Sequence, residues 1–340
     1  MEDLKNKEFE KNPNLAFKEI IKDIDCCFGI NDVFDIYYDQ KQNNELYLIT
    51  ADKNYSISIT RIKDKKLMKS IPSGQKNQIK MLRHFHSPKN NNNYLISSFS
   101  KSILKIYDLS NNYNLIHIIN PNYSQNSIIY SSVLHFSQKG DFIITSSNSD
   151  DVNKDYTKIY DFSNGNFLEN IDFTNRVDIY YLLLFKKDDN DFLIQCSMRD
   201  VYLYNFESKD LFILRKNENS TIHNSACLVK NNGIDYLYVG NVNGLIDVWN
   251  LNNYKLEQSI KYLNCYFYHL ISWNNRYILI AEKTNCSIII IDTMLNKVVS
   301  VIKDIHQSFV ISLKKIIHPI YGEGLLSSGF DNKIYMWTHR

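Results

Sequence analysis

Tyr236–Ile260 reads YLYVGNVNGLIDVWNLNNYKLEQSI. Three short apolar runs, LYVG, LIDVW and KLEQSI, are separated here by Asn-Val-Asn-Gly and by Leu-Asn-Asn-Tyr. Runs rich in β-branched and aromatic residues that are joined by a Gly/Asn turn predict a β-hairpin, and the third run extends it to a meander. Such a unit buries little apolar surface by itself, so we expect copies of it elsewhere in the chain.

Copies are found by following Trp249, the residue that ends the middle run. The matching positions are Ile59, Tyr107, Tyr160, Tyr204, Trp249, Ile291 and Trp337. Subtracting neighbouring residue numbers gives spacings of 48, 53, 44, 45, 42 and 46 residues. A period of about 45 residues built from strands is typical of the blades of a β-propeller. A helical repeat would instead space its apolar residues at intervals of 3.6.

The predicted fold is all-β, because every copy also has two strand-like runs upstream of the middle run. In the copy around Trp249 these are SACLVKN and DYLYVG. Four strands in each of seven copies predict a seven-bladed β-propeller of four-stranded antiparallel blades. We expect one such domain over residues 15–340 and a flexible tail over residues 1–14.

The seventh copy stops short of its outer strand, since only three residues follow Trp337. The segment Phe17–Ile24 (FKEIIKDI) is similar to the outer runs of the other copies. We therefore expect this N-terminal strand to pair with the last blade, which closes the ring and removes exposed sheet edges. The alternative is a short amphipathic helix, because four apolar residues also suit one helical face: Leu15, Ile20, Ile21 and Ile24.

The seventh copy resembles the WD-repeat β-propeller family. IHQSFVISL, from Ile305, is similar to the family's Gly-His-x-x-x-Val stretch with Ile in place of Gly, and LLSSGFDNKIYMW is similar to its Ser-x-x-x-Asp turn and closing Trp. In that family the His, Ser, Asp and Trp form a hydrogen-bonded brace inside a blade. The resemblance implies such a brace for His306, Ser327, Asp331 and Trp337.

The other copies depart from this pattern. The fifth copy keeps Trp249 and a candidate His223, but it has Asn243 where the family has Asp and Val239 where it has Ser. The first, second, third, fourth and sixth copies lack the Trp. The resemblance therefore covers about 320 residues as a repeat, while it leaves the subfamily open.

Charge and cysteine content narrow the class of protein. The 340 residues include 39 basic and 37 acidic ones, a net charge of +2, with no long block of one sign. No nucleic-acid arm is expected from this balance. The charged start lacks the apolar segment of a secretory signal, and the most apolar run, SIIII at 287–291, is too short to cross a membrane. Six cysteines without a C-x-x-C pair predict buried free thiols in the cytoplasm, with the nucleus as the alternative.

Motifs for catalysis or metal binding are weak. His84 and His86 alternate on a predicted strand and so share a face, which is half of a metal site, but no third ligand follows from the sequence. The acidic runs at 149–155 and 186–191 lack the Gly and Glu of a calcium loop. No nucleophile elbow, phosphate loop or zinc-protease motif occurs. We expect no catalytic residue, metal or cofactor.

Aromatic residues near the loops of one propeller face are the candidate partner-binding residues, and packing at the rim is the equal alternative for each. They are Tyr55, Phe99, Tyr123, Tyr156, Phe267 and Phe330. The predicted function is a non-enzymatic protein–protein interaction scaffold, as a subunit or adaptor of a multiprotein complex that binds proteins or peptides through face loops.

Two other functions compete with the scaffold. An enzyme with its site at the central channel needs converging polar side chains, whereas the inner runs, such as IYYLLLF and FVISLKK, are mostly apolar. A nucleic-acid-binding propeller needs a basic face, whereas the loops mix signs, with Lys101 and Arg199 alongside Asp150 and Glu218. We expect protein partners, and no membrane, nucleic-acid or small-molecule ligand.

Overall fold

The computed structural model describes residues 18–19, 34–51, 55–74, 78–99, 102–121, 123, 127–148, 157–171, 179–197, 200–214, 223–262, 266–318 and 322–338. These residues form β-strands and one short 3-10 helix, Gln40–Gln42. Within these ranges no helix has both the length and the apolar character that a membrane span requires. The chain divides into two compact units, residues 26–215 and residues 1–25 with 216–340.

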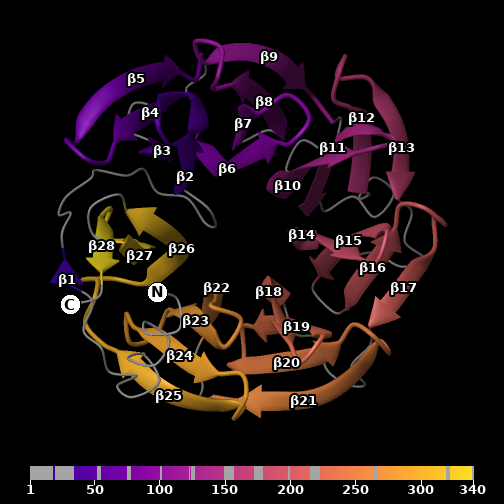
Figure 1. Ribbon diagram of the computed structural model, residues 1–340, viewed down its shortest axis with the longest axis vertical. Helices are drawn as coiled ribbons and strands as arrows, with labels where there is room; N and C mark the ends of the chain where they lie inside the picture. The colour runs from indigo at the N-terminus through magenta and orange to yellow at the C-terminus, as the bar shows by residue number, and fades with distance from the viewer. Residues whose placement is uncertain are drawn as a thin grey trace. The chain divides into compact units, whose positions relative to one another are not determined.

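The unit of residues 26–215 contains four antiparallel sheets, which we call blades 1 to 4 in chain order (Figure 1). Each is a meander of four consecutive strands. Blade 1 is β2 (Phe34–Asp39), β3 (Glu45–Ala51), β4 (Ser56–Arg61) and β5 (Lys66–Pro72); blade 2 is β6 (Ile79–Ser87), β7 (Asn92–Phe99), β8 (Ile103–Asp108) and β9 (Asn114–Ile119). Blade 3 is β10 (Ile128–Ser137), β11 (Gly140–Asn148), β12 (Thr157–Asp161) and β13 (Phe167–Ile171); blade 4 is β14 (Ile179–Lys187), β15 (Asn190–Ser197), β16 (Val201–Asn205) and β17 (Leu211–Leu214).

The second unit contains three further four-stranded sheets, blades 5 to 7. Blade 5 is β18 (His223–Asn231), β19 (Ile234–Asn241), β20 (Leu245–Asn250) and β21 (Lys255–Lys261); blade 6 is β22 (Phe267–Trp273), β23 (Tyr277–Glu282), β24 (Ile288–Asp292) and β25 (Lys297–Ile302). Blade 7 is β26 (Val310–His318), β27 (Gly322–Gly329), β28 (Ile334–Thr338) and β1 (Lys18–Glu19). All seven predicted anchor positions, from Ile59 to Trp337, lie in the third strand of a blade.

The N-terminal strand closes the last blade as predicted. In β1, Lys18 pairs with Thr338 and Glu19 with Trp337, in antiparallel register. The pairing supplies the fourth strand of blade 7. The rest of the predicted segment, residues 17 and 20–24, lies outside the described residues, as does the predicted tail.

Five outer strands carry a β-bulge where they pair with the third strand. The register shifts lie at Ile59/Thr60, Ile106/Tyr107, Ile159/Tyr160, Val248/Trp249 and Ile290/Ile291. A bulge twists an edge strand and interrupts its ladder, which protects the edge from pairing with other chains. In these five blades the β-bulge therefore lies at or next to the anchor residue of the repeat.

Apolar clusters between consecutive blades form the core. One cluster joins Tyr238 and Val248 of blade 5 to Ile280 and Ile289 of blade 6. Another joins Trp273 of blade 6 to residues of blade 7. The whole of β24, IIIID, is buried. A strand that is covered on both faces needs no alternation of polar and apolar residues, which explains the continuously apolar runs in the sequence.

A repeated hydrogen bond ties neighbouring inner strands together. A side chain of one inner strand accepts the main-chain N–H of the next inner strand at 3.0–3.1 Å. The pairs are Ser131 with Leu182, Ser225 with Leu270, and His269 with Leu313. The inner edge of a sheet presents main-chain N–H groups that need acceptors, and these bonds supply them.

Blade 2 has no such acceptor at this position, and a donor, Arg83, links it to its neighbours. Met81, which has no strong acceptor, stands at the position that Ser131 occupies in blade 3. Arg83 Nη1 donates to Ser131 Oγ at 3.1 Å and to Leu182 O at 3.0 Å, so this side chain links blades 2, 3 and 4. Its guanidinium also lies 5.2 Å from the centre of the Tyr181 ring, a distance that fits a cation–π contact.

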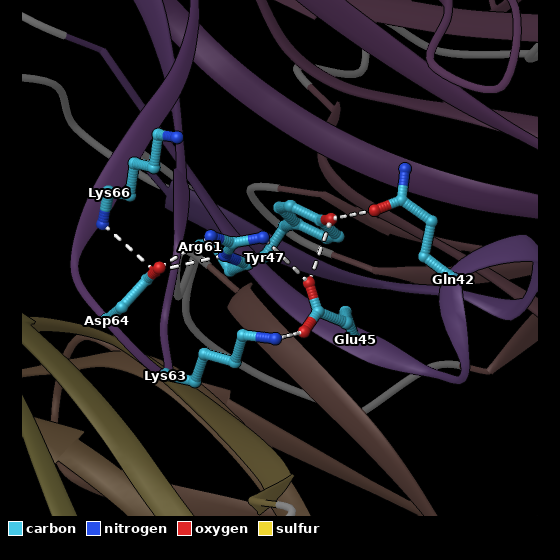
Figure 2. Close-up of polar contacts among 7 residues, drawn as sticks. All are labelled: Gln42, Glu45, Tyr47, Arg61, Lys63, Asp64 and Lys66. Carbon is cyan, nitrogen blue, oxygen red and sulfur yellow. Dashed lines mark hydrogen bonds and ion pairs between the residues drawn. The ribbon is translucent and has the colours of Figure 1, made fainter.

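A polar network fixes the turns at one end of blade 1. Figure 2 shows Arg61 between two carboxylates, donating to Asp64 at 2.5 and 3.0 Å and to Glu45 at 3.3 Å. Lys63 and the Tyr47 hydroxyl also bond Glu45. The hydrogen bond from Arg61 is the main reason that the pKa of Asp64 falls to about 2. These contacts hold the turn before β5 against β3.

The closing strand predicts a difference between two truncations. Deletion of residues 1–25 removes β1 and uncovers the edge of β28 at Trp337 and Thr338. We expect the midpoint of thermal unfolding to fall by about 5 °C or more, while deletion of residues 1–12 changes it by about 1 °C or less. Circular dichroism melts of both variants beside the full chain measure this. Equal midpoints for the two truncations would contradict a stabilising role for the strand.

Candidate partner-binding face

The four residues that the sequence implied as a brace lie together in blade 7. Trp337 Nε1 donates to Ser327 Oγ at 2.8 Å, and Ser327 Oγ lies 2.9 Å from His306 Nε2. His306 Nδ1 lies 2.9 and 3.0 Å from the two Asp331 oxygens. A His306 tautomer with its proton on Nδ1 satisfies the whole chain: Trp to Ser, Ser to His, His to Asp. The imidazole is buried, so each bond replaces one to water.

Asp331 also fixes the surrounding loops. Its carboxylate accepts the N–H of Gln307 at 2.9 Å and the N–H of Lys333 at 3.2 Å. Burial by itself raises the pKa of Asp331, but the hydrogen bonds from His306 and the main chain outweigh it and hold the pKa below its ordinary value. Gly329 leaves room for this contact, since a Cβ there would lie 2.5 Å from His306 Nδ1.

Blade 5 fixes the same turn with a different residue. Trp249 is buried, and His223 starts β18 opposite Asn241, with its side chain outside the described part of the structure. Asn241 Oδ1 accepts the N–H of Asn243 at 2.9 Å and of Leu245 at 3.0 Å. In blade 5 the turn acceptor is therefore Asn241, and the sequence pattern did not single it out.

Blade 6 uses a buried glutamate at the corresponding end of its second strand. Glu282 accepts the N–H of Thr284 at 2.5 Å, the N–H of Asn285 at 2.8 Å and the hydroxyl of Ser287 at 3.0 Å. Three donors compensate the burial of this carboxylate. Blades 5, 6 and 7 thus meet one demand, an acceptor for the turn between the second and third strands, with Asn, Glu and Asp.

Two of the predicted partner-binding rings pack under lysines of which one, Lys105, is buried and the other, Lys158, is half-buried. Phe99 is fully buried, and Lys105 Nζ lies 5.3 Å from its centre and donates to Ser73 O. Tyr123 is buried under Lys158, whose Nζ lies 4.5 Å from the ring centre. The two rings are therefore structural, which corrects their assignment to a partner-binding surface.

The remaining predicted rings have different fates. Phe267 is fully buried in the cluster between blades 5 and 6, so it too is removed from the binding surface. Tyr156 lies outside the described residues. Tyr55, which precedes β4 in the unit of residues 26–215, is 38% exposed. Phe330 is half-buried in the turn between β27 and β28, and it has aromatic neighbours.

Phe330 and four other half-buried residues form what we call the aromatic patch. Its members are Tyr266, Tyr268, Lys283, Phe309 and Phe330. Main-chain bonds pair the segments, from Lys283 N to Tyr266 O at 3.0 Å in blade 6 and from Phe330 N to Phe309 O at 2.9 Å in blade 7. Ring centres lie 5.1 Å apart for Tyr266 and Tyr268, 6.3 Å for Tyr268 and Phe330, and 5.8 Å for Phe309 and Phe330. The patch therefore spans the loops of two neighbouring blades.

Lys283 joins the two halves of the patch. Its Nζ lies 5.1 Å from the centre of the Tyr266 ring and 5.0 Å from that of Phe309, so the ammonium contacts one ring from each blade. Burial, with the neighbouring Tyr266, raises the pKa of Tyr268. Of the five patch residues, the sequence singled out only Phe330 and missed the other four. It also pointed to Phe267, which is buried.

The two histidines weighed as half of a metal site share a structural partner instead. His84 Nε2 lies 2.9 Å and His86 Nδ1 lies 3.3 Å from Asn93 Oδ1. Both rings thus lie on one face of β6 as expected, and both bond one amide oxygen. No group of three or more potential metal ligands occurs in the part of the chain that the structure describes.

No protein-family model and no curated protein matches the chain. Among solved structures 1516 chains match. One is the crystal structure of BBS1N in complex with ARL6DN, soaked with mercury, with a TM-score of 0.70 and 11% sequence identity over 96% of this chain and 97% of that chain. At this identity the likeness shows the fold, and the predicted seven-bladed β-propeller is confirmed. The WD-repeat resemblance stays a prediction.

The brace predicts a contrast between two adjacent serines. Ser327→Ala leaves His306 Nε2 and Trp337 Nε1 without their shared partner, so we expect the free energy of unfolding to fall by about 1–3 kcal/mol. Ser328 is buried next to it, and its hydroxyl has no hydrogen-bond partner within the described residues. Ser328→Ala should therefore change stability by less than about 0.5 kcal/mol. Urea unfolding measures both, and a similar loss in the two variants would argue against the brace.

The lowered pKa of Asp331 predicts how stability depends on pH. A carboxyl group whose pKa is depressed by folding stabilises the protein above its unfolded pKa of about 4, and the contribution is lost as pH falls through the folded value. The stability gap between the wild type and Asp331→Asn should be widest near neutral pH and narrow below about pH 4. Urea unfolding at several pH values tests this, and a gap that does not change with pH contradicts it.

Proposed function

We propose that the chain is a non-enzymatic protein–protein interaction scaffold, a subunit or adaptor of a multiprotein complex that binds its partner through loops on one face of the propeller. The aromatic patch carries this proposal. Tyr, Trp and Phe are enriched at protein interfaces, where they fill pockets of the partner at low entropic cost. Four half-buried rings in and next to loops of two blades fit this role better than they fit a solvated surface.

The comparison with BBS1N supports the same class of function. That propeller was crystallised in complex with ARL6DN, another protein. A WD-repeat origin, which the brace of blade 7 favours, would fit equally well. The proposal assigns no catalytic residue and no cofactor, and it includes no membrane, nucleic-acid or small-molecule ligand.

A reducing compartment, the cytoplasm or alternatively the nucleus, is part of the proposal. Cys196 and Cys227 are free thiols buried inside blades 4 and 5. Burial raises the pKa of Cys196 to about 12, so the unreactive thiol form persists at neutral pH. Such residues act as small apolar side chains in the core.

The test is purification of the tagged full chain from its own cells, followed by mass spectrometry and gel filtration. We expect proteins that co-purify in fixed ratio with the chain and an apparent size well above 40.1 kDa. A matched bait, Phe167→Ala on the exposed outer strand of blade 3, should capture the same proteins because Phe167 is not one of the patch residues. A monomer without stoichiometric partners would overturn the scaffold proposal.

A further inference from the structure

We infer that the aromatic patch recognises an acidic side chain of its partner, an Asp or Glu beside an apolar or aromatic residue. The inference rests on the proposed function and names the chemistry of its partner. The decisive group is Lys283, which holds the centre of the patch between a ring of blade 6 and a ring of blade 7.

The Lys283 charge has no counter-ion within the described residues. Its ammonium contacts the Tyr266 and Phe309 rings, and no carboxylate of the described chain lies within ion-pair distance. Aromatic faces attract a cation but do not neutralise it. A half-buried ammonium on two rings is therefore a favourable place for a carboxylate, since charge-assisted hydrogen bonds are about twice as strong as neutral ones.

The two acidic residues that adjoin patch residues in the chain are bonded by other donors. Glu282, next to Lys283 in the chain, bonds two main-chain N–H groups and a serine hydroxyl. Asp331, next to Phe330, is bonded by His306 and by two N–H groups. Both carboxylates are committed to the turns that carry the patch. An incoming carboxylate therefore meets an ammonium with unused donor capacity.

The aromatic rings of the patch determine which kind of ligand side chain can bind next to the acidic one. Phe309 and Phe330 meet edge to face at 89°, and Tyr268 meets Phe330 at 63°, so each ring is held by another ring. Phe330 is also held by its main-chain bond to Phe309 and by the brace at the next residue. Rigid, half-exposed rings favour an apolar or aromatic side chain of the ligand.

Single-stranded nucleic acid is the competing ligand, because bases stack on aromatic rings and phosphates bind lysine. That mode needs a basic groove along several nucleotides. The patch has one lysine at its centre, and the exposed charges of the adjoining loop, Lys303 and Asp304, have opposite signs. One local cation suits one carboxylate better than a run of phosphates.

The probe is a random dodecapeptide phage library selected on the full chain. We expect selected sequences to share an Asp or Glu next to Phe, Tyr, Trp or Leu. Fluorescence polarisation of one labelled peptide should show at least about tenfold weaker binding for its Glu→Gln version, for Lys283→Met and for Phe309→Ala. Binding should also weaken in about 0.5 M salt, since the contact is partly ionic.

Two control variants separate the patch from general effects of charge and apolar surface. Lys255→Met removes an exposed lysine from the outer strand of blade 5, and Phe167→Ala removes an exposed ring from that of blade 3. Both should bind the peptide like the wild type. Circular dichroism melts of all variants exclude unfolding as the cause of a loss.

The inference is overturned if the selected peptides lack acidic residues, if their binding survives Lys283→Met, or if labelled oligothymidine binds more tightly and competes with them. Failure here is distinct from failure of the scaffold proposal. Proteins that co-purify equally with the wild type and with Lys283→Met would leave the scaffold intact and refute the role of the patch.

Discussion

A four-stranded blade has two apolar faces, and only another blade can cover them. This constraint governs the rest of the structure. The clusters that hold the core are shared between consecutive blades, as in the cluster that joins Tyr238 to Ile280 and in the one centred on Trp273. The third strand β24 is buried throughout, and a buried site that needs only apolar volume tolerates several different residues. This packing requires a repeated pattern of apolar strands, but it does not require the same sequence motif in every blade.

The same constraint explains why the architecture was readable from the sequence. The period depends on the spacing between apolar runs and turn residues, and the seven anchors from Ile59 to Trp337 all proved to lie in third strands. The orientation of single rings was not readable in this way. Phe267 is buried, while its neighbours Tyr266 and Tyr268 belong to the patch, because successive strand residues face opposite sides. An error of one residue in the predicted register therefore exchanges the buried and the exposed side chains. The β-bulge between Phe267 and His269 makes it harder still to predict which side chains are buried.

Long-range partners were also beyond the sequence pattern. Phe99 and Tyr123 looked like loop aromatics, but lysines from third strands, the buried Lys105 and the half-buried Lys158, lie over their rings. Each lysine donates to a carbonyl in the loop that precedes its own blade. A short stretch of sequence does not predict that a lysine side chain packs beneath a loop. Burial of a lysine is costly unless a particular acceptor is within reach, and that acceptor lies far away in the sequence. The structural role of these rings therefore depends on contacts between distant positions.

Polar side chains at the turns show how far the repeat has diverged. Asp331, Glu282 and Asn241 each accept main-chain N–H groups at the turn that leads into the third strand, and each does so from a different sequence context. Several side chains satisfy the same main-chain donors, so the residues change while the fold is kept. The variation among blades agrees with a chain that has the propeller fold and matches no family model. In blade 7 the brace gives more than stability. It fixes Asp331, the residue after Phe330, and so holds one wall of the patch in place. A wall that is already rigid would lose little conformational entropy on binding, so the braced blade suits the recognition surface that we propose.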